Sequence, residues 1–181
     1  MQGKKYIGLV VLATTALMAC NSNHQSVETK DTATVVAVDT SAVTLPGFKD
    51  EKLQDIYTNY IKLKDQLVAS NYETTKSVAS DLSVVLAAFK GCESAVGIAA
   101  EIASAENIKE QRAAFTDLNV EIIPIFKHAE LSSGTIYVQH CPMANKGNGG
   151  DWLSSEKKIQ NPYYGNEMME CGRVAEEIKA K

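Results

Sequence analysis

The sequence lacks the short motifs by which several large enzyme classes bind or attack their substrates. It has no Gly-x-Ser-x-Gly turn, no dinucleotide fingerprint and no glycine-rich loop that ends in the Lys-Ser/Thr pair of a phosphate-binding loop. A cysteine nucleophile is disfavoured as well, because the adjacent His140 and Cys141 would face opposite sides of a strand. We therefore expect a protein without enzymatic activity.

The chain also has fewer basic than acidic residues. The 181 residues carry 18 Lys and Arg against 22 Asp and Glu, which gives a formal net charge of -4. An acidic chain lacks the basic surface that holds a nucleic-acid backbone, so we expect no nucleic-acid partner. Mild acidity suits a protein that handles cations, although it is common among domains with other roles.

The apolar run near the N-terminus is too short to cross a membrane. It follows Lys4 and Lys5, covers residues 6–19 (YIGLVVLATTALMA) and ends in small residues. A membrane-spanning helix needs about 20 apolar residues, which disfavours an uncleaved anchor helix. A positive start, a short apolar stretch and small residues at its end are typical of a secretory signal peptide. We assign this signal peptide to residues 1–19.

The apolar run leads into LMAC, residues 17–20, which resembles the lipobox of bacterial lipoproteins. This resemblance implies cleavage before Cys20, acylation of the Cys20 sulfur and attachment to a membrane through lipid. Asn21 stands where some bacterial lipoproteins have an aspartate that retains them in the inner membrane. The resemblance therefore implies the outer membrane, with the protein facing the periplasm. Residues 20–45 are expected to form the lipidated start and a flexible tether.

Residues 46–181 are expected to fold as a single, mainly helical domain. Apolar residues recur there at intervals of three and four, as on one face of a helix. We expect four principal helices, over about residues 48–68, 70–89, 94–103 and 106–128. Ser70 and Glu73 have the spacing of a capping box, Gly91 is expected to stop the second helix, and Pro124 to kink or end the fourth. Short connections favour an antiparallel helical bundle.

After Gly134 we expect irregular structure packed on the helices. Residues 135–139 (TIYVQ) have strand character, the following segments are rich in Gly, Pro and Asn, and residues 173–179 favour one or two helical turns. Because binding residues are often found on loops that a rigid scaffold positions, we expect the function to reside in this segment.

Soft sulfur ligands gather in this segment in two short groups. Cys141 and Met143 are two residues apart, so they point to the same side of an extended strand. Met168 and Cys171 are three apart, so they share a face of a helical turn. Thiolate and thioether sulfur select Cu(I) over hard cations. We therefore predict a metal site with ligands Cys141, Met143, Met168 and Cys171, and with His140, Met169 and Trp152 as secondary candidates.

The same cysteines are equally well explained as a disulfide. The periplasm is oxidising, and a Cys141–Cys171 disulfide would contribute about 3.5–4 kcal/mol of stability by closing its loop. The disulfide and the metal site are also compatible as redox alternatives of one pair. Zinc is disfavoured, since the close ligand pairs of a structural zinc module are missing. Cys92 makes the cysteine count of the folded domain odd, and we interpret it as a small buried hydrophobe.

The C-terminal segment resembles the signature of a known family. Residues 137–172 contain a CPM, a Trp, an NPYYG and an MxxCG in order. This pattern resembles a bacterial secreted domain family of unknown function, which occurs as lipoproteins and as an extension of membrane-fusion subunits of heavy-metal efflux pumps. The helical part is similar to the same family, so the resemblance spans about residues 48–179. It implies copper or silver handling in the periplasm.

These observations favour two alternative functions. The first is a periplasm-facing lipoprotein that binds a soft heavy metal, Cu(I), and buffers it or passes it to an efflux-pump adaptor. The second is a non-catalytic structural or interaction module, in which a Cys141–Cys171 disulfide holds a surface that docks on such an adaptor. The sequence leaves the metal, the redox state of the pair and the partner open.

Overall fold

The computed structural model describes residues 44–181, so the predicted signal peptide, Cys20 and nearly all of the predicted tether lie outside the described residues. In the described part, no helix is long and apolar enough to cross a membrane. The elements follow one another in the order β1 (Gly47–Phe48), α1 (Glu51–Val68), α2 (Tyr72–Ala87), α3 (Glu93–Ser104), α4 (Ile108–Lys127), β2 (Leu131–Ser133), β3 (Thr135–Cys141), α5 (Ala144–Gly147), β4 (Gly150–Ser154), the short 3-10 helix η1 (Gly165–Glu167) and β5 (Arg173–Lys179).

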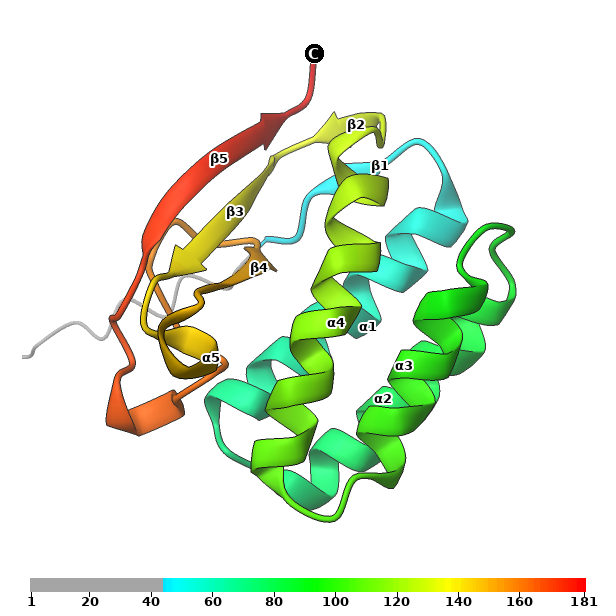
Figure 1. Cartoon of the computed structure of the whole chain (residues 1–181). Coiled ribbons are helices and arrows are strands. Elements are labelled where there is room, and N and C mark those ends of the chain that lie inside the picture. Colours follow the sequence, from blue (N-terminus) through cyan, green and yellow to red (C-terminus); the bar gives the residue numbers. More distant parts are fainter. Residues whose placement is uncertain (1–43) are drawn as a thin grey trace, which may run out of the picture. The chain divides into compact units, whose positions relative to one another are not determined.

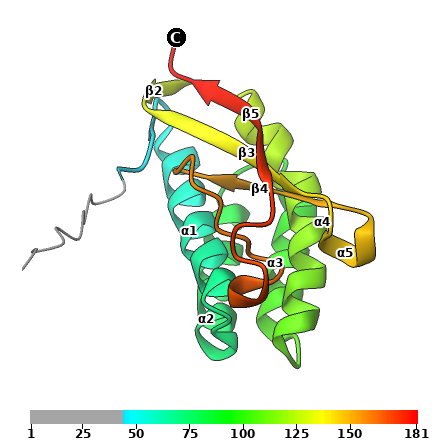
Figure 2. The ribbon, with the colours of Figure 1, turned by 90° about the vertical axis from the view of Figure 1, so that its left-hand side faces the viewer.

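Helices dominate the domain, which confirms the prediction of a mainly helical fold. Helix α1 packs on α2, α2 on α3, and α3 on α4 (Figure 1). A three-stranded antiparallel sheet in the order β4-β3-β5 covers the side of α1 and α4 that faces away from α2 and α3 (Figures 1 and 2). Strands β1 and β2 form a separate antiparallel pair. The C-terminal segment, expected to be largely irregular, therefore contributes all three strands of this sheet.

Helix α2 begins one residue later than the sequence suggested. Its N-cap is Asn71, whose side-chain oxygen accepts a hydrogen bond from the backbone N–H of Thr74. Ser70 has a positive φ of 55° and its hydroxyl accepts a hydrogen bond from Arg112 instead. The predicted capping box is therefore wrong, because the Ser70 side chain is hydrogen-bonded to Arg112 of α4 and does not cap α2.

Helix α4 does not end at its proline. It continues through Pro124 to Lys127, so the helical stretch is close to the predicted one. Proline has no backbone N–H to donate to the preceding turn, which is a local cost to the helix. The buried neighbours Ile122 and Phe126 keep this end of α4 packed on the core, and we attribute the continuation to that packing.

The C-terminal residues form strand β5, where helical turns had been predicted. Strand β3 is central and pairs with β4 on one side and with β5 on the other. The β3–β5 register shifts between Val138, which faces Glu176, and Gln139, which faces Val174. This irregularity is a β-bulge, which adds one residue to β5 and bends it.

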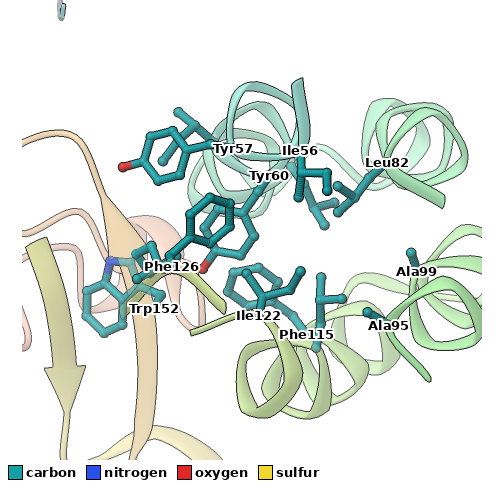
Figure 3. Packing of buried hydrophobic residues seen from close by; sticks show 14 of the residues in the cluster. Ile56, Tyr57, Tyr60, Leu82, Ala95, Ala99, Phe115, Ile122, Phe126 and Trp152 are labelled. Carbon is teal, nitrogen blue, oxygen red and sulfur yellow. Dashed lines mark hydrogen bonds between the residues drawn. The ribbon is translucent and has the colours of Figure 1, made fainter. Parts of the chain in front are cut away.

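The core joins the helices to the sheet. Tyr57 and Tyr60 of α1 and Phe126 of α4 lie between the helices and Trp152 of β4, and all four are fully buried (Figure 3). The ring centroids of Tyr57 and Phe126 are 5.2 Å apart. Burying a side chain of this kind contributes about 1.5–3 kcal/mol. The sheet is therefore an integral part of the hydrophobic core.

Candidate functional site

The two predicted cysteine ligands lie side by side. Cys141 is the last residue of β3, and Cys171 stands two residues before β5, which is paired with β3 through His140 and Arg173. Their Sγ atoms are 2.7 Å apart, although 30 positions separate the two residues in the chain. The pairing of β3 with β5 therefore brings two thiols together at one end of the sheet, one from each predicted ligand group.

Gly172 allows this close approach of the strands. Its φ is +148°, and a Cβ at this position would lie 2.9 Å from the backbone oxygen of His140 and 3.0 Å from the Trp152 ring. Both contacts are shorter than ordinary van der Waals distances, so no larger residue fits without displacing β3 or the core. The glycine that follows Cys171 in the MxxCG pattern therefore has a steric role.

The two thiols differ in their surroundings. Cys141 is fully buried, whereas Cys171 is partly exposed. The pKa of Cys171 is raised by the hydrogen bond with Cys141, by burial and by the neighbouring Cys141 charge, while the backbone N–H of Met143 opposes this rise. A raised pKa favours the thiol at neutral pH, so oxidation or metal binding at Cys171 must release a proton.

Two of the predicted methionines, Met143 and Met168, contact Cys171 through their backbones. Met143, which is 52% exposed, follows β3 in the CPM turn and its N–H is directed at Cys171. The carbonyl of Met168 accepts a hydrogen bond from the Cys171 N–H over 3.1 Å, and that of Met169 accepts one from Asn161 over 2.9 Å. The predicted sulfur residues therefore come from two loops that meet at the end of the sheet.

The remaining secondary candidates have other contacts. His140 points to the other side of β3 from Cys141, and its Nδ1 lies 2.8 Å from Oδ1 of Asp151. Trp152 packs against Tyr163 in the core with ring centroids 6.0 Å apart. Among residues 44–181, no three or more His, Cys, Asp or Glu side chains gather closely enough to hold a metal ion. Among these residue types, Cys141 and Cys171 are therefore the only two ligands that the described part of the chain brings together at this site.

Asn161 of the NPYYG motif holds the Cys171 turn in place. It is fully buried. Its Nδ2 donates to the carbonyl of Cys171 over 2.9 Å, and its Oδ1 accepts from the N–H of Tyr163 over 2.8 Å. Asn161 lies within the NPYYG part of the signature, but its residue type and spacing did not reveal this role. Its role connects two parts of that signature, NPYYG and MxxCG.

The two tyrosines of the same motif hold the other strand ends. Tyr164 donates its hydroxyl to the carbonyl of Met143 over 2.6 Å and thereby fixes the CPM turn. Tyr163 donates its hydroxyl to the carbonyl of Asp151 in β4 over 2.8 Å. NPYYG therefore contacts each of the segments that build the cysteine pair.

Helix α4 supports this arrangement with one stripe of polar side chains. Arg112 Nε donates to the carbonyl of Pro162 over 2.9 Å, and Thr116 donates its hydroxyl to Oδ1 of Asn145 over 3.0 Å. Asn119 donates its side-chain amide to the hydroxyl of Tyr163 over 3.2 Å. Residues four and three apart share a helix face. One face of α4 thus positions the whole C-terminal site.

A buried hydrogen-bond network contacts the free edge of β4. Tyr60 donates to Oδ1 of Asn119 over 2.6 Å, and its oxygen accepts the backbone N–H of Leu153 over 2.9 Å. With the Tyr163 hydroxyl on the Asp151 carbonyl, two backbone polar groups of this edge are hydrogen-bonded to side chains of the core. Burial raises the pKa of Tyr60 and of Tyr163 well above the ordinary tyrosine value.

The fold and the site define a mainly helical domain that carries two adjacent cysteines, one buried and one partly exposed, at the end of a small antiparallel sheet. Residues 56–134 match the model of a family described as "Protein of unknown function (DUF3347)". This match runs from within α1 through α4 and ends before β3, so it does not include the CPM-to-MxxCG segment. Neither a curated protein nor a solved structure matches the chain.

Proposed function

We propose that the protein is an outer-membrane lipoprotein facing the periplasm that binds a soft metal ion, with Cu(I) as its cargo, through Cys141 and Cys171. The observation that carries this proposal is the 2.7 Å separation of the two Sγ atoms. A pair of thiolates with little other ligand chemistry around it favours a soft ion that accepts a small number of sulfur ligands. A four-helix bundle would serve as the rigid scaffold for this site.

The surroundings of the pair fit such cargo. The exposed Met143 lies on the turn whose N–H faces Cys171, so its thioether is the natural third ligand. Two thiolates that share one ion lie about 3.8 Å apart if the metal–sulfur distance is about 2.3 Å and the site is tetrahedral. Binding therefore requires the sulfurs to move apart by about 1 Å, and the partly exposed Cys171 is the one with room to move.

A role in metal transfer is supported by the sequence. Residues 137–172 resemble a family that is also appended to membrane-fusion subunits of heavy-metal efflux pumps. The protein would buffer Cu(I) in the periplasm or pass it to such an adaptor. Handover by ligand exchange needs an exposed ligand, and Met143 provides one.

The second candidate is a structural or interaction module with a Cys141–Cys171 disulfide. Two observations favour it: Cys141 is fully buried, and the described residues offer the pair no third His, Cys, Asp or Glu ligand. The disulfide would cross-link β3 to the start of β5 and contribute about 3.5–4 kcal/mol by the chain-entropy estimate. The surface it stabilises would then dock on the adaptor.

A native-state thiol count separates the two functions. Full-length protein is prepared anaerobically, with and without one equivalent of Cu(I), and the alkylated cysteines are identified by mass spectrometry. For a metal site, Cu(I) should protect Cys141 and Cys171 together. For the structural module, the pair should already be oxidised, and after mild reduction Cu(I) should give no protection. Cys92→Ala is the control, because Cys92 contributes no ligand and its loss should not change the result.

A further inference from the structure

A cavity of about 480 Å³ lies beside the CPM turn and takes no part in the proposed metal site. Its wall includes the first two turns of α4, the turn at Asn145 and Lys146, and Tyr164. Three segments far apart in the sequence thus meet around it. Cavities of this size, lined by apolar groups with a few convergent polar ones, are typical of small-molecule sites.

The charge of the cavity is opposite to that of the protein. Lys109, Arg112 and Lys146 line it, with Glu167 as the one carboxylate in the wall, whereas the whole chain has a formal net charge of -4. Basic groups gathered in a concave site focus the field and attract anions.

The fold holds the Arg112 side chain and the backbone at Lys146 in place, whereas the side chains of Lys109 and Lys146 are exposed. Arg112 Nε donates a hydrogen bond to the carbonyl of Pro162 over 2.9 Å, and its Nη2 donates one to the carbonyl of Leu67 over 3.0 Å. Asn145 and Lys146 both lie in the left-handed backbone region, with φ of 53° at Asn145 and 60° at Lys146. Such conformations cost about 1–3 kcal/mol each in non-glycine residues and persist when the surroundings impose them. Here Asn145 is anchored by Thr116 and by the carbonyl of Gly149, at 3.0 and 2.9 Å.

We propose that this cavity binds a small organic anion, in which an acidic group faces Lys109 and Lys146 and an apolar body packs against Ile108 and Tyr164. The apolar wall explains why the ligand should be more than an inorganic ion. Tyr164 also donates its hydroxyl to the Met143 carbonyl over 2.6 Å. An occupant of the cavity would therefore touch the residue that fixes the CPM turn beside the cysteine pair.

The test uses 8-anilinonaphthalene-1-sulfonate, an aromatic anion, and its uncharged analogue N-phenyl-1-naphthylamine as fluorescent probes of the reduced, metal-free full-length protein. We expect saturable binding of the anion, and each of Lys109→Gln and Lys146→Gln should weaken it about fivefold, as expected for one partly exposed ion pair. Lys90→Gln makes the same charge change on the exposed α2–α3 turn and should leave the affinity unchanged.

Circular dichroism melting curves of the three variants establish that each is folded. Equal affinities of wild type, Lys109→Gln and Lys146→Gln for the anion would overturn the proposal, and so would equal binding of the charged and uncharged probes. Cys141→Ser should bind the anionic probe as the wild type does, since that site is separate. A failure of copper binding therefore leaves this result unaffected.

Discussion

Asn161 and Cys171 are joined by a hydrogen bond of 2.9 Å from the side-chain amide of Asn161 to the carbonyl oxygen of Cys171. The backbone N–H of Asn161 donates to the carbonyl of Met169 over 2.9 Å. The turn before β5 is therefore held by both the side chain and the backbone of this one buried residue. The position of the Cys171 sulfur relative to Cys141 depends on this turn. The NPYYG motif is therefore part of the cysteine site without supplying a ligand.

Replacing Asn161 with alanine should destabilise the domain by about 2–4 kcal/mol, because the partly buried carbonyl of Cys171 and the buried N–H of Tyr163 lose their partner. Urea unfolding followed by circular dichroism measures this change. In the folded variant, the Cys141–Cys171 disulfide should also form more slowly under a glutathione redox buffer.

The control for this variant is Asn166→Ala, which removes an exposed asparagine from the same segment. Its unfolding midpoint and oxidation rate should equal those of the wild type. If Asn161→Ala behaves in the same way as Asn166→Ala, the proposed support of Cys171 by Asn161 is wrong.

The helices were predictable because their signal is local. In α1, Leu53, Ile56, Tyr57 and Tyr60 recur at three- and four-residue intervals, and all four are buried in the structure. Helix ends were less predictable, since the Ser70 side chain is bound by Arg112, 42 positions away in the chain. No local pattern reveals such a partner.

Strand β5 was missed because its sequence fits two structures. Its partly buried apolar residues Val174 and Ile178 are four apart, which is the spacing of one helix face and also of one strand face. The pairing of Cys141 with Cys171 was inferred from residue type and compartment, and the structure places them together. The supporting roles of Asn119 and Asn161 depend on contacts over 44 and 10 positions, which spacing alone does not show.

Gly172→Ala should destabilise the domain by about 1–3 kcal/mol. A Cβ would lie 2.9 Å from the His140 oxygen and 3.0 Å from the Trp152 ring, at a positive φ that alanine rarely adopts. Gly97→Ala is the matched control, because Gly97 lies inside α3 and a Cβ there meets nothing within 4 Å. That variant should be more stable by about 0.5–1 kcal/mol. Thermal unfolding of both tests the prediction, which fails if they shift in the same direction.

Tyr163→Phe should cost about 1–3 kcal/mol of stability. The change leaves the Asp151 carbonyl without its hydrogen-bond donor and Asn119 without one acceptor, while the ring still fills the core. Tyr137→Phe serves as the control, since the Tyr137 hydroxyl makes no hydrogen bond to another of the described residues. Chemical denaturation should separate the two variants. Equal midpoints would show that the edge of β4 does not depend on this network.

Alkaline conditions should destabilise the domain from about pH 10 upward. Burial raises the pKa of Tyr57, Tyr60 and Tyr163 in the folded protein, so these groups ionise in the unfolded chain first. A raised folded-state pKa gives stability that is present below the unfolded value of about 10 and is lost as the pH rises above it. Melting temperatures between pH 7 and pH 11 measure this loss. It should be shallower in Tyr163→Phe than in Tyr137→Phe, and parallel curves would contradict the assignment.

Copper binding should depend on the two cysteines and on Met143 in different ways. Cys141→Ser should abolish tight Cu(I) binding to the reduced protein. Met143→Leu should weaken it by about tenfold, the factor that corresponds to about 1.4 kcal/mol, and should leave Zn(II) binding nearly unchanged, because thioether sulfur prefers the softer ion. The exchange nearly conserves volume at a side chain that is 52% exposed, so the melting temperature should not change.

Competition with a chromophoric Cu(I) chelator under anaerobic conditions gives these affinities. Val84→Ala, which alters another exposed apolar side chain, should leave them as in the wild type. Air-oxidised wild-type protein should lose Cu(I) binding and melt at a higher temperature, because a Cys141–Cys171 disulfide removes both thiolates and cross-links the sheet. Equal Cu(I) affinity of the wild type and Cys141→Ser would rule out the site. Oxidised protein that still binds Cu(I) tightly would show that the ion is held elsewhere in the chain.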